Sequence, residues 1–366
     1  MTAGPLAASG GAASGGATAQ GSVHGLDNER VTAWLTEHVE GAVAPFRFRI
    51  IAGGHSNLTY RVDDAGGRRM VLRRPPLGHV LASAHDMGRE HRIVSSLHDT
   101  AVPVPTALGY CPDDDVIGAP FYVMDFVDGH VVRDLAIAEA MLTPVARANA
   151  SQSVADTLAA LHTVDVDAVG LGDLARHDGY IARQLKRWHG QWEQQRTREL
   201  PLVDEVHAEL LARIPEQGPA TIVHGDYRLD NAIVSDDGSL VAVLDWEICT
   251  LGDPLADLGL LHVYWTGPGD EPSAWGGRST TASGFWDRRQ LIDRYAEVSG
   301  RNISQLGFYV AFGYWKLACI LEGVYARYLG GALGDRDASE LQPFVDQVDA
   351  AAVKAAEHVD GLDGRG

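Results

Sequence analysis

The sequence of 366 residues has few cysteines and a shortage of positive charge. Its three cysteines, Cys111, Cys249 and Cys319, are odd in number, lie far apart and show no metal-ligand spacing. The sequence therefore predicts no disulfide framework and favours a reducing compartment, the cytoplasm. There are 30 basic against 49 acidic residues, which gives a formal charge of −19. Binding to a phosphate backbone requires the opposite sign, so no nucleic-acid partner is expected.

Long hydrophobic runs and targeting segments are also scarce. The most apolar segment, residues 306–321, is short for a bilayer crossing, and Lys316 interrupts it. We expect a buried helix of a globular domain there, and no stable membrane insertion. Residues 1–22 are almost entirely Gly, Ala, Ser and Thr, without the basic start and apolar core of a signal peptide. This stretch has no apolar periodicity to offset the entropy lost on ordering, so we predict a disordered tail.

The rest of the chain changes character near residue 128. Residues 23–127 are rich in segments that alternate like β-strands, and the turn Asp63-Asp-Ala-Gly-Gly67 is typical of a β-hairpin. Residues 128–366 are mostly helical. Their short predicted strands lie at 220–223, 232–235 and 240–244. A small β-rich lobe followed by a larger helical lobe indicates an α+β fold, not alternating βα units.

The feature that indicates a catalytic site is a polar loop between apolar strands. It reads Val223-His-Gly-Asp-Tyr-Arg-Leu-Asp-Asn-Ala-Ile-Val234, and a second carboxylate, Asp245, follows at the end of the return strand. Phosphoryl transfer needs a carboxylate that orients and deprotonates the acceptor hydroxyl, and oxygen ligands that hold Mg²⁺ against the phosphates. Asp226 suits the first role, and Asn231 and Asp245 suit the second. Their order and loop spacing match the kinase signature H-R-D-L-x-x-x-N with its later metal-binding Asp.

Two neighbouring residues of this loop are given supporting roles. His224 is expected to stabilise the loop by hydrogen bonding, because Asp226 is better placed to act as the base. Asp230, which stands beside Asn231, is interpreted as a turn residue, since Asp and Asn favour turns and caps.

Together these residues resemble the aminoglycoside phosphotransferase and choline kinase-like family, which is related to the protein kinases. The family hallmark H-G-D-x-x-x-x-N is met by the loop described above, and Asp245 supplies the later Asp. The resemblance extends over most of residues 43–329, and residues 71–76 with 83–91 are similar to a subgroup found fused to or beside acyl-CoA dehydrogenases. It implies a protein-kinase-like bilobal fold, ATP and Mg²⁺ as cofactors, and transfer of phosphate to a hydroxyl group.

The resemblance also implies nucleotide contacts in the first lobe. Gly53, Gly54 and Ser56 lie between the first two strands, where kinases place a loop over the ATP phosphates. Glycines there let backbone N–H groups approach an anion closely. Asp125 belongs to the segment that joins the lobes, whose amide and carbonyl groups meet the adenine ring in the family.

An arginine replaces the family's usual lysine on the third strand. Arg73 stands at the position that touches the phosphates, and Glu90, on a helix predicted at residues 83–97, is its expected partner. Arginine keeps the charge and can bind phosphate in a bidentate way, but it is longer and planar. Arg74 faces the opposite side of the strand, so we expect it at the surface.

Further residues of the second lobe receive roles from the same resemblance. Arg228 lies two positions after Asp226, where many protein kinases have a Lys that reaches the transferred phosphoryl group. A salt bridge to a neighbouring carboxylate is an equally good interpretation of Arg228. Asp253 and Asp257 are structural in the family, and Asp257 is expected to hold the backbone of the catalytic loop from the start of a helix.

The expected acceptor is a small molecule bound between the catalytic loop and the helical lobe. Aromatic side chains that can line such a site, or equally form core, are Trp188, Trp192, Trp265, Tyr314 and Trp315. The acidic charge tolerates an aminoglycoside, whereas the dehydrogenase-linked subgroup favours a hydroxylated acyl compound, and both remain open.

Two other classes compete with a small-molecule kinase. Arg73 keeps open a nucleotide-binding protein without transfer activity. A protein kinase is disfavoured because no Ala-Pro-Glu motif follows and Gly252-Asp-Pro begins only seven residues after Asp245 (252 − 245). The sequence indicates no oligomeric state.

Overall fold

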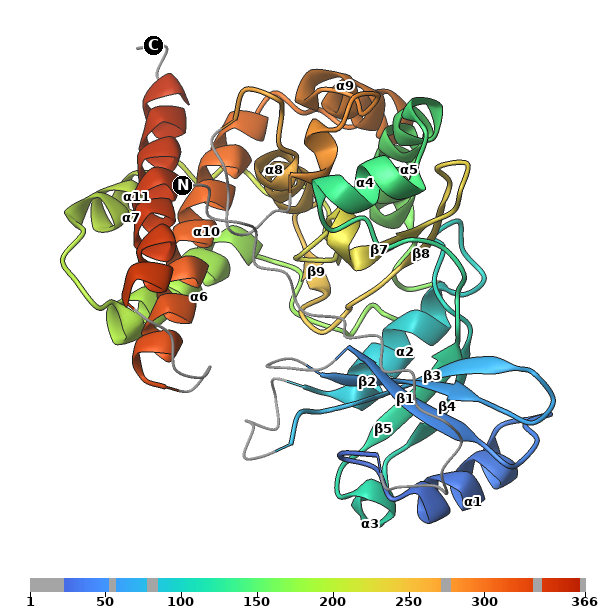
Figure 1. Ribbon diagram of the computed structural model, residues 1–366. Coiled ribbons are helices and arrows are strands. Elements are labelled where there is room, and N and C mark those ends of the chain that lie inside the picture. The colour runs from blue at the N-terminus through green and yellow to red at the C-terminus, as the bar shows by residue number, and fades with distance from the viewer. Residues whose placement is uncertain (1–22, 53–56, 78–84, 271–277, 332–337, 363–366) are drawn as a thin grey trace.

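The computed structural model describes residues 23–52, 57–77, 85–270, 278–331 and 338–362, and it has the predicted α+β architecture. A five-stranded antiparallel sheet with three helices lies beside a larger part that is mostly helical (Figure 1). The tail predicted at residues 1–22 lies outside the described residues, and the lobe boundary near residue 128 stays a prediction.

The sheet combines the three consecutive strands β1 to β3 with the antiparallel pair of β4 and β5, and β3 joins β5 at the centre. Its order is β1-β2-β3-β5-β4, and every neighbouring pair is antiparallel. Its strands are β1 (Arg47–Ala52), β2 (Leu58–Asp63), β3 (Arg69–Arg74), β4 (Ala107–Cys111) and β5 (Phe121–Asp125). The predicted hairpin joins β2 to β3, and Gly67 in its turn has φ +89°, a conformation that glycine adopts at little cost.

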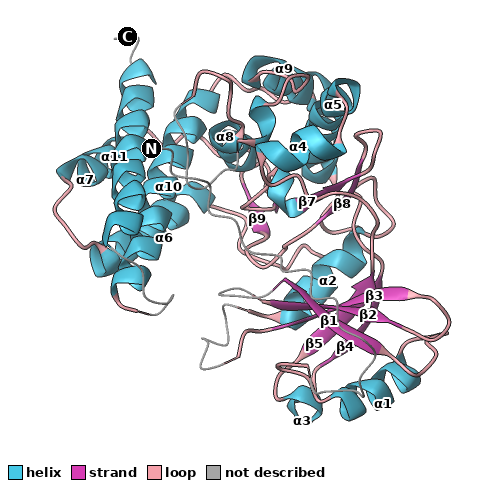
Figure 2. Cartoon of the chain, in the orientation of Figure 1, coloured by secondary structure: helices cyan, strands magenta, loops and turns pink. Residues whose placement is uncertain are grey.

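Helices cover both faces of this sheet (Figure 2). Helix α1 (Asn28–His38) buries Val31, Trp34 and Leu35 against one face, and the short α3 (Asp114–Ile117) lies beside α1. Helix α2 (Met87–Leu97) lies on the other face, where Met87 packs with side chains from β3 and β5. The side chain of Asp86 accepts a hydrogen bond from Arg89 N, so α2 begins after this cap, and residues 83 and 84 of the predicted helix lie outside the described residues.

The expectation that Arg74 lies at the surface is wrong. Arg74 is only 4% exposed, and its guanidinium donates to the carbonyl oxygens of Gly25 and Ile117. Strand alternation placed this side chain on the face opposite Arg73, but it gave no sign that the chain before α1 and the end of α3 cover that face.

The helical part contains two small two-stranded sheets, and the polar loop connects one to the other. Strand β6 (Thr221–Val223) pairs with β9 (Thr250–Gly252), and β7 (Ala232–Val234) pairs with β8 (Leu240–Val243). The helices are α4 (Leu135–Met141), α5 (Pro144–Thr163), α6 (Tyr180–Gln195), α7 (Pro201–Ala212), α8 (Leu255–Tyr264), α9 (Arg288–Ser299), α10 (Leu306–Leu329) and α11 (Ala338–Leu362). Single 3₁₀ turns occur at Leu229–Asn231 and Ser279–Thr281.

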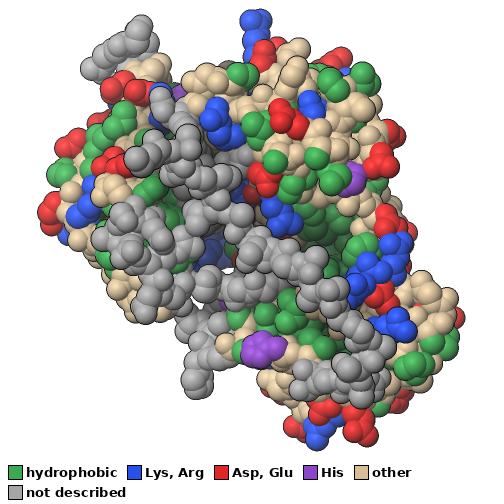
Figure 3. Space-filling model, viewed as in Figure 1, with side chains coloured by type: hydrophobic (Ala, Val, Ile, Leu, Met, Phe, Trp, Pro, Cys, Tyr) green, Lys and Arg blue, Asp and Glu red, His purple; other side chains and the backbone are tan. Residues whose placement is uncertain are grey.

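Helix α10 is the centre of this part and contains the most apolar segment of the sequence. It packs against α6, α7, α8 and α11, as Figure 1 shows. A Cβ atom on Gly259 of α8 would lie 2.5 Å from the backbone of Tyr309 in α10, so these helices approach too closely for a larger residue. No helix among the described residues is long and apolar enough to cross a bilayer. On the face drawn in Figure 3, acidic and basic side chains are interspersed.

Candidate active site

The polar loop after β6 is held by the buried carboxylate of Asp257. Its Oδ2 accepts from the backbone N–H of His224 at 2.6 Å, and its Oδ1 accepts from Gly225 N at 2.7 Å. Asp257 is 1% exposed in the first turn of α8. Burial acts to raise the pKa of Asp257, but contacts with His162, His224 and the Gly225 N–H outweigh it, so the pKa is lowered. The predicted supporting role of Asp257 is confirmed.

His224 also stabilises the loop, as predicted. Its Nε2 lies 2.9 Å from the carbonyl oxygen of Leu244, which can only accept, so Nε2 carries the hydrogen. Its Nδ1 then accepts from Asp226 N at 3.3 Å. Both ring nitrogens are engaged with backbone, and neither is available to take a proton from an acceptor.

The structure brings Asp226 and Asn231 into direct contact. The Nδ2 of Asn231 donates to the carboxylate of Asp226 at 2.7 Å and to its carbonyl oxygen at 2.9 Å. Leu244 N donates to the Asn231 carbonyl at 2.8 Å, which ties the loop to the end of β8. Because the amide nitrogen of Asn231 points to Asp226, its Oδ1 remains as an acceptor suited to a cation.

Asp245 follows β8 and meets an arginine from the sheet. Its φ is +64°, an uncommon conformation for a residue with a side chain. Its Oδ1 lies 2.9 Å from Nη2 of Arg73, whose Nε lies 3.4 Å from Oε2 of Glu90. Burial acts to lower the pKa of Arg73, but Tyr122, Glu90 and Asp245 together raise it, so the cation is kept. The predicted pairing of Arg73 with Glu90 is present, and a contact with phosphate stays a prediction.

Three residues that the sequence analysis missed complete this part of the site. Asn57 donates through Nδ2 to Glu90 at 3.0 Å and to Glu247 at 3.3 Å, and its Oδ1 lies 2.9 Å from Nδ1 of His85. The only sequence signal was position, since Asn57 follows the glycine-rich loop and Glu247 stands two residues after Asp245.

Glu247 adds a third carboxylate to the cluster. Glu90, Asp245 and Glu247 each offer an oxygen atom, and these atoms all lie within 4.8 Å of one another. Burial, with added repulsion from Asp245 and Glu90, raises the pKa of Glu247 to about 7. Burial likewise raises the pKa of Glu90. The three carboxylates therefore repel one another, and either protonation of Glu247 or a bound cation would relieve this repulsion.

Arg228 forms the salt bridge that the sequence left open. Its Nε lies 3.6 Å from the Asp226 carboxylate and its Nη2 lies 3.3 Å from that of Asp230. The guanidinium also stacks over the ring of Tyr264 at 4.8 Å. Burial raises the pKa of Asp230, which lies in the 3₁₀ turn of the loop. A contact between Arg228 and the transferred phosphoryl group stays a prediction.

Of the remaining predicted nucleotide contacts, the structure describes only Asp125. Gly53, Gly54 and Ser56 lie outside the described residues. The side chain of Asp125 accepts from Arg68 at 3.0 Å, and its N–H donates to the Thr106 carbonyl at 2.9 Å. An adenine contact at Asp125 stays a prediction, and it would involve the carbonyl oxygen.

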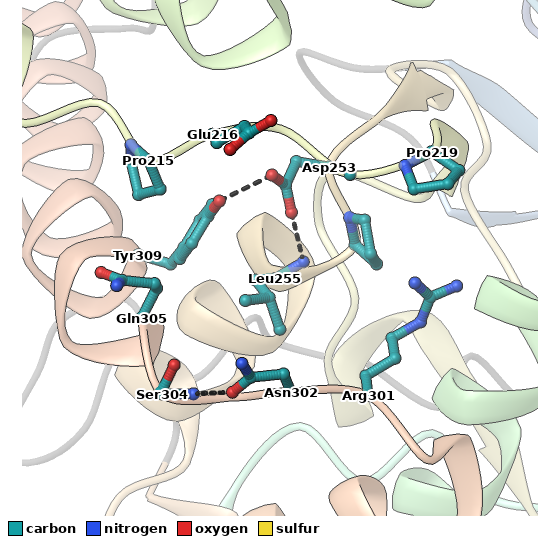
Figure 4. Close-up of a pocket in the computed structure, with 12 residues that line it drawn as sticks. Pro215, Glu216, Pro219, Asp253, Leu255, Arg301, Asn302, Ser304, Gln305 and Tyr309 are labelled. Atoms are coloured by element: carbon teal, nitrogen blue, oxygen red, sulfur yellow. Dashed lines mark hydrogen bonds between the residues drawn. The ribbon is translucent and has the colours of Figure 1, made fainter.

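The aromatic residues that were predicted to line an acceptor site lie in different surroundings in the helical part. A cavity of about 330 Å³ lies at the start of α8, and no predicted catalytic or metal residue lines it. Asp253 accepts a hydrogen bond there from Tyr309 at 2.6 Å (Figure 4). Arg228 instead lines a narrow crevice with Tyr264 and Trp265. Trp192 and Trp315 are fully buried, so for these two the core interpretation is correct.

Comparisons with known proteins identify the family of the chain. A model of the phosphotransferase enzyme family matches residues 47–293. Human acyl-CoA dehydrogenase family member 11 is 32% identical over 340 residues, which cover 88% of this chain and 43% of that protein. Mouse acyl-CoA dehydrogenase family member 10 is 35% identical over 78% of this chain and 27% of its own length. The chain thus spans less than half the length of these curated relatives.

Solved structures share the fold over nearly the whole chain. A candidate aminoglycoside phosphotransferase from Ralstonia eutropha is 32% identical, with a TM-score of 0.77 over 92% of this chain and 98% of that one. The aminoglycoside phosphotransferase APH(4)-Ia, solved as a mutant with AMP-PNP and hygromycin B, has a TM-score of 0.57 over 90% and 97% of the chains. At 19% identity the second likeness shows the fold alone. The family match and the relatives above 30% identity establish that this chain belongs to the phosphotransferase enzyme family.

Proposed function

We propose that the chain transfers the γ-phosphoryl group of ATP to a hydroxyl group of a small molecule, with Mg²⁺ as its cofactor. The observation that carries this proposal is the convergence of Asp226, Asn231 and Asp245. Asn231 bonds directly to Asp226, and its backbone carbonyl accepts from Leu244, the residue before Asp245. These contacts support a set of two proposed metal ligands and one proposed base, which is the set that phosphoryl transfer requires.

Asp226 is the proposed base. Its carboxylate accepts hydrogen bonds from Asn231 and from the Tyr264 hydroxyl and lies near the Arg228 cation, and its side chain is 29% exposed. It can therefore orient an acceptor hydroxyl and take its proton as the bond to phosphorus forms. The alternative base, His224, has both ring nitrogens engaged with the backbone.

Asn231 and Asp245 fit the donor set of Mg²⁺, because both present oxygen atoms. The bound ion would neutralise charge on the phosphate oxygens. Arg73 now neutralises Asp245 from 2.9 Å, and its second contact with Glu90 keeps the guanidinium in place at the base of the sheet. We propose that, when the nucleotide is bound, the Arg73 guanidinium also donates hydrogen bonds to its phosphate oxygens.

For the acceptor, we place hydroxylated acyl compounds before aminoglycosides. Curated relatives at 32% and 35% identity carry the name of acyl-CoA dehydrogenases. One solved structure, from Ralstonia eutropha and also 32% identical, carries the name of an aminoglycoside phosphotransferase, whereas APH(4)-Ia, solved with hygromycin B, is 19% identical. A screen of hydroxyacyl thioesters, hydroxy acids and aminoglycosides with radiolabelled ATP tests this order. Labelling of aminoglycosides alone would reverse it.

Nucleotide binding without transfer is the second candidate, because Arg73 is bound to the very carboxylate that Mg²⁺ needs. Calorimetry with Mg²⁺-ATP followed by the acceptor screen separates the two. Tight binding with no labelled product from any acceptor would favour the second candidate and contradict transfer.

A further inference from the structure

A buried lysine of α10 lies directly beneath the catalytic loop. Lys316 is 6% exposed, and its Nζ donates to the carbonyl oxygen of Gly225 at 3.0 Å. In sequence, this residue only interrupts the most apolar segment of the chain. In the structure it reaches across 91 positions to the residue immediately before Asp226.

This lysine is an unfavourable choice for a purely structural position. An ammonium group taken out of water loses solvation that a few contacts rarely restore, and an apolar residue of similar volume is often as stable or more stable. Burial lowers the pKa of Lys316, while the carboxylates of Asp226 and Asp257 act in the opposite direction. The Trp188 ring lies 5.4 Å from Nζ and adds a weak attraction. Packing alone therefore does not explain a cation here.

What Lys316 holds is one end of the peptide bond that leads into Asp226. Its ammonium binds the Gly225 carbonyl, while Nδ1 of His224 accepts from the N–H of Asp226 at the other end of the same bond. Gly225 has φ +87°, and a Cβ there would lie 3.1 Å from Ile248. The plane of this peptide therefore fixes the direction in which the Asp226 carboxylate projects.

We propose that Lys316 is a positioning residue for phosphoryl transfer, which sets the orientation of Asp226 through the Gly225 carbonyl. The inference rests on the proposed function, since it requires Asp226 to act on the acceptor. It also assigns α10 a part in the reaction. The helix donates a hydrogen bond to the loop backbone, whereas Asp257 of α8 accepts hydrogen bonds from it.

The test compares Lys316→Met with Lys316→Gln, two replacements of equal length that differ in the ability to donate a hydrogen bond. Release of inorganic phosphate from Mg²⁺-ATP, with water as the acceptor, is measured together with the melting temperature. We expect Lys316→Met to lower kcat about 10- to 100-fold, with KM for ATP changed less than about twofold and an unchanged or higher melting temperature. Lys316→Gln should keep more of kcat than Lys316→Met. Cys319→Ala, one turn further along α10, is the control for loosened packing and should keep kcat.

A purely structural role predicts the opposite order, with Lys316→Met at least as active as Lys316→Gln. Equal rates in wild type and Lys316→Met would also overturn the inference. Amide exchange across residues 222–231 supplies a readout that needs no turnover, and faster exchange at Asp226 in Lys316→Met is expected. Unchanged exchange there would contradict the hydrogen bond's role. Asp226→Asn separates the two proposals: if it releases phosphate at the wild-type rate, the proposed function fails, whereas wild-type rate in Lys316→Met alone removes only the role of Lys316.

Discussion

The two sides of the candidate site are built in different ways. The catalytic loop is held from within the helical part by Asp257, His224 and Lys316, which are at most 6% exposed and bond to the backbone. The side facing the sheet depends on side-chain contacts across the chain, in which Arg73 meets Asp245 and Asn57 meets Glu247. Asp245 and Glu247 have 31% and 24% of their side chains exposed.

This difference separates a preformed part of the site from an adaptable one. Backbone hydrogen bonds to buried groups fix the position of Asp226 before any ligand binds, which favours catalysis by preorganisation. Under the proposed function, the ion pair between Arg73 and Asp245 would instead have to rearrange for Asp245 to bind a metal–nucleotide complex. Substitutions on the loop side should therefore reduce turnover, and those on the sheet side should reduce nucleotide affinity.

The largest effect is expected from Asp226→Asn, which removes the proposed base while keeping the size of the side chain. Removal of a general base costs about 10²- to 10⁴-fold in rate. We expect kcat to fall within that range while affinity for Mg²⁺-ATP changes little. Product formation and calorimetric binding check the two halves of this statement, and a parallel loss of binding would place Asp226 on the nucleotide side.

The second-largest effect is expected when the loop loses the carboxylate of Asp257. Asp257→Ala leaves the N–H groups of His224 and Gly225 without their buried acceptor, and breaking a buried charged network costs about 3 kcal/mol of unfolding free energy. Urea denaturation measures this loss. Asp253→Ala is the matched control, because Asp253 is also a buried aspartate near the start of α8 but bonds to Leu255 and Tyr309 instead of the loop. Equal activity losses in both variants would contradict a specific role for Asp257.

A smaller change in affinity is expected at Arg73. Arg73→Met removes the cation, and we expect Mg²⁺-ATP affinity to fall about tenfold, in the range of one charge-assisted contact. Arg73→Lys keeps the positive charge, so its affinity for Mg²⁺-ATP should stay within about threefold of that of the wild type. Unchanged affinity in Arg73→Met would remove this residue from the nucleotide site.

The smallest effect concerns the pH dependence of stability in metal-free protein. The pKa of Glu247 is raised from 4.5 to about 7, so the folded state binds more protons than the unfolded state between these values. The free energy of unfolding should therefore fall as pH rises through this window. Glu247→Gln removes the titrating group and should be about 1 kcal/mol more stable than wild type at pH 8, since solvent screens part of the effect. Denaturation with a chelator present should show this advantage disappearing near pH 5.

The sequence was informative about local elements and about residues close together in the chain. The loop from His224 to Asn231 and the hairpin before Asp245 were predicted because their chemistry and spacing lie within one short stretch. Glu90 was predicted as a partner of Arg73 only through the family resemblance. The pairing of Arg73 with Glu90 forms as predicted, whereas the contact of Arg73 with Asp245 was not expected.

Contacts across long stretches of the chain were missed. Asn57 bonds to Glu247 across 190 positions, and Lys316 reaches Gly225 across 91. Periodicity indicates which face of a strand or helix a residue occupies, but it does not identify what covers that face. The same limit explains the buried Arg74, whose partners lie before α1 and at the end of α3.

The central claim is that Asp226, Asn231 and Asp245 form one Mg²⁺-dependent phosphotransfer site. Calorimetric titration of ATP into wild type and Asp245→Asn, with and without Mg²⁺, tests it most directly. The account predicts binding in wild type that strengthens with Mg²⁺, and loss of that Mg²⁺ dependence in Asp245→Asn. Equal Mg²⁺-dependent affinity in both proteins would contradict the assignment of Asp245 as a metal ligand, and with it the proposed site.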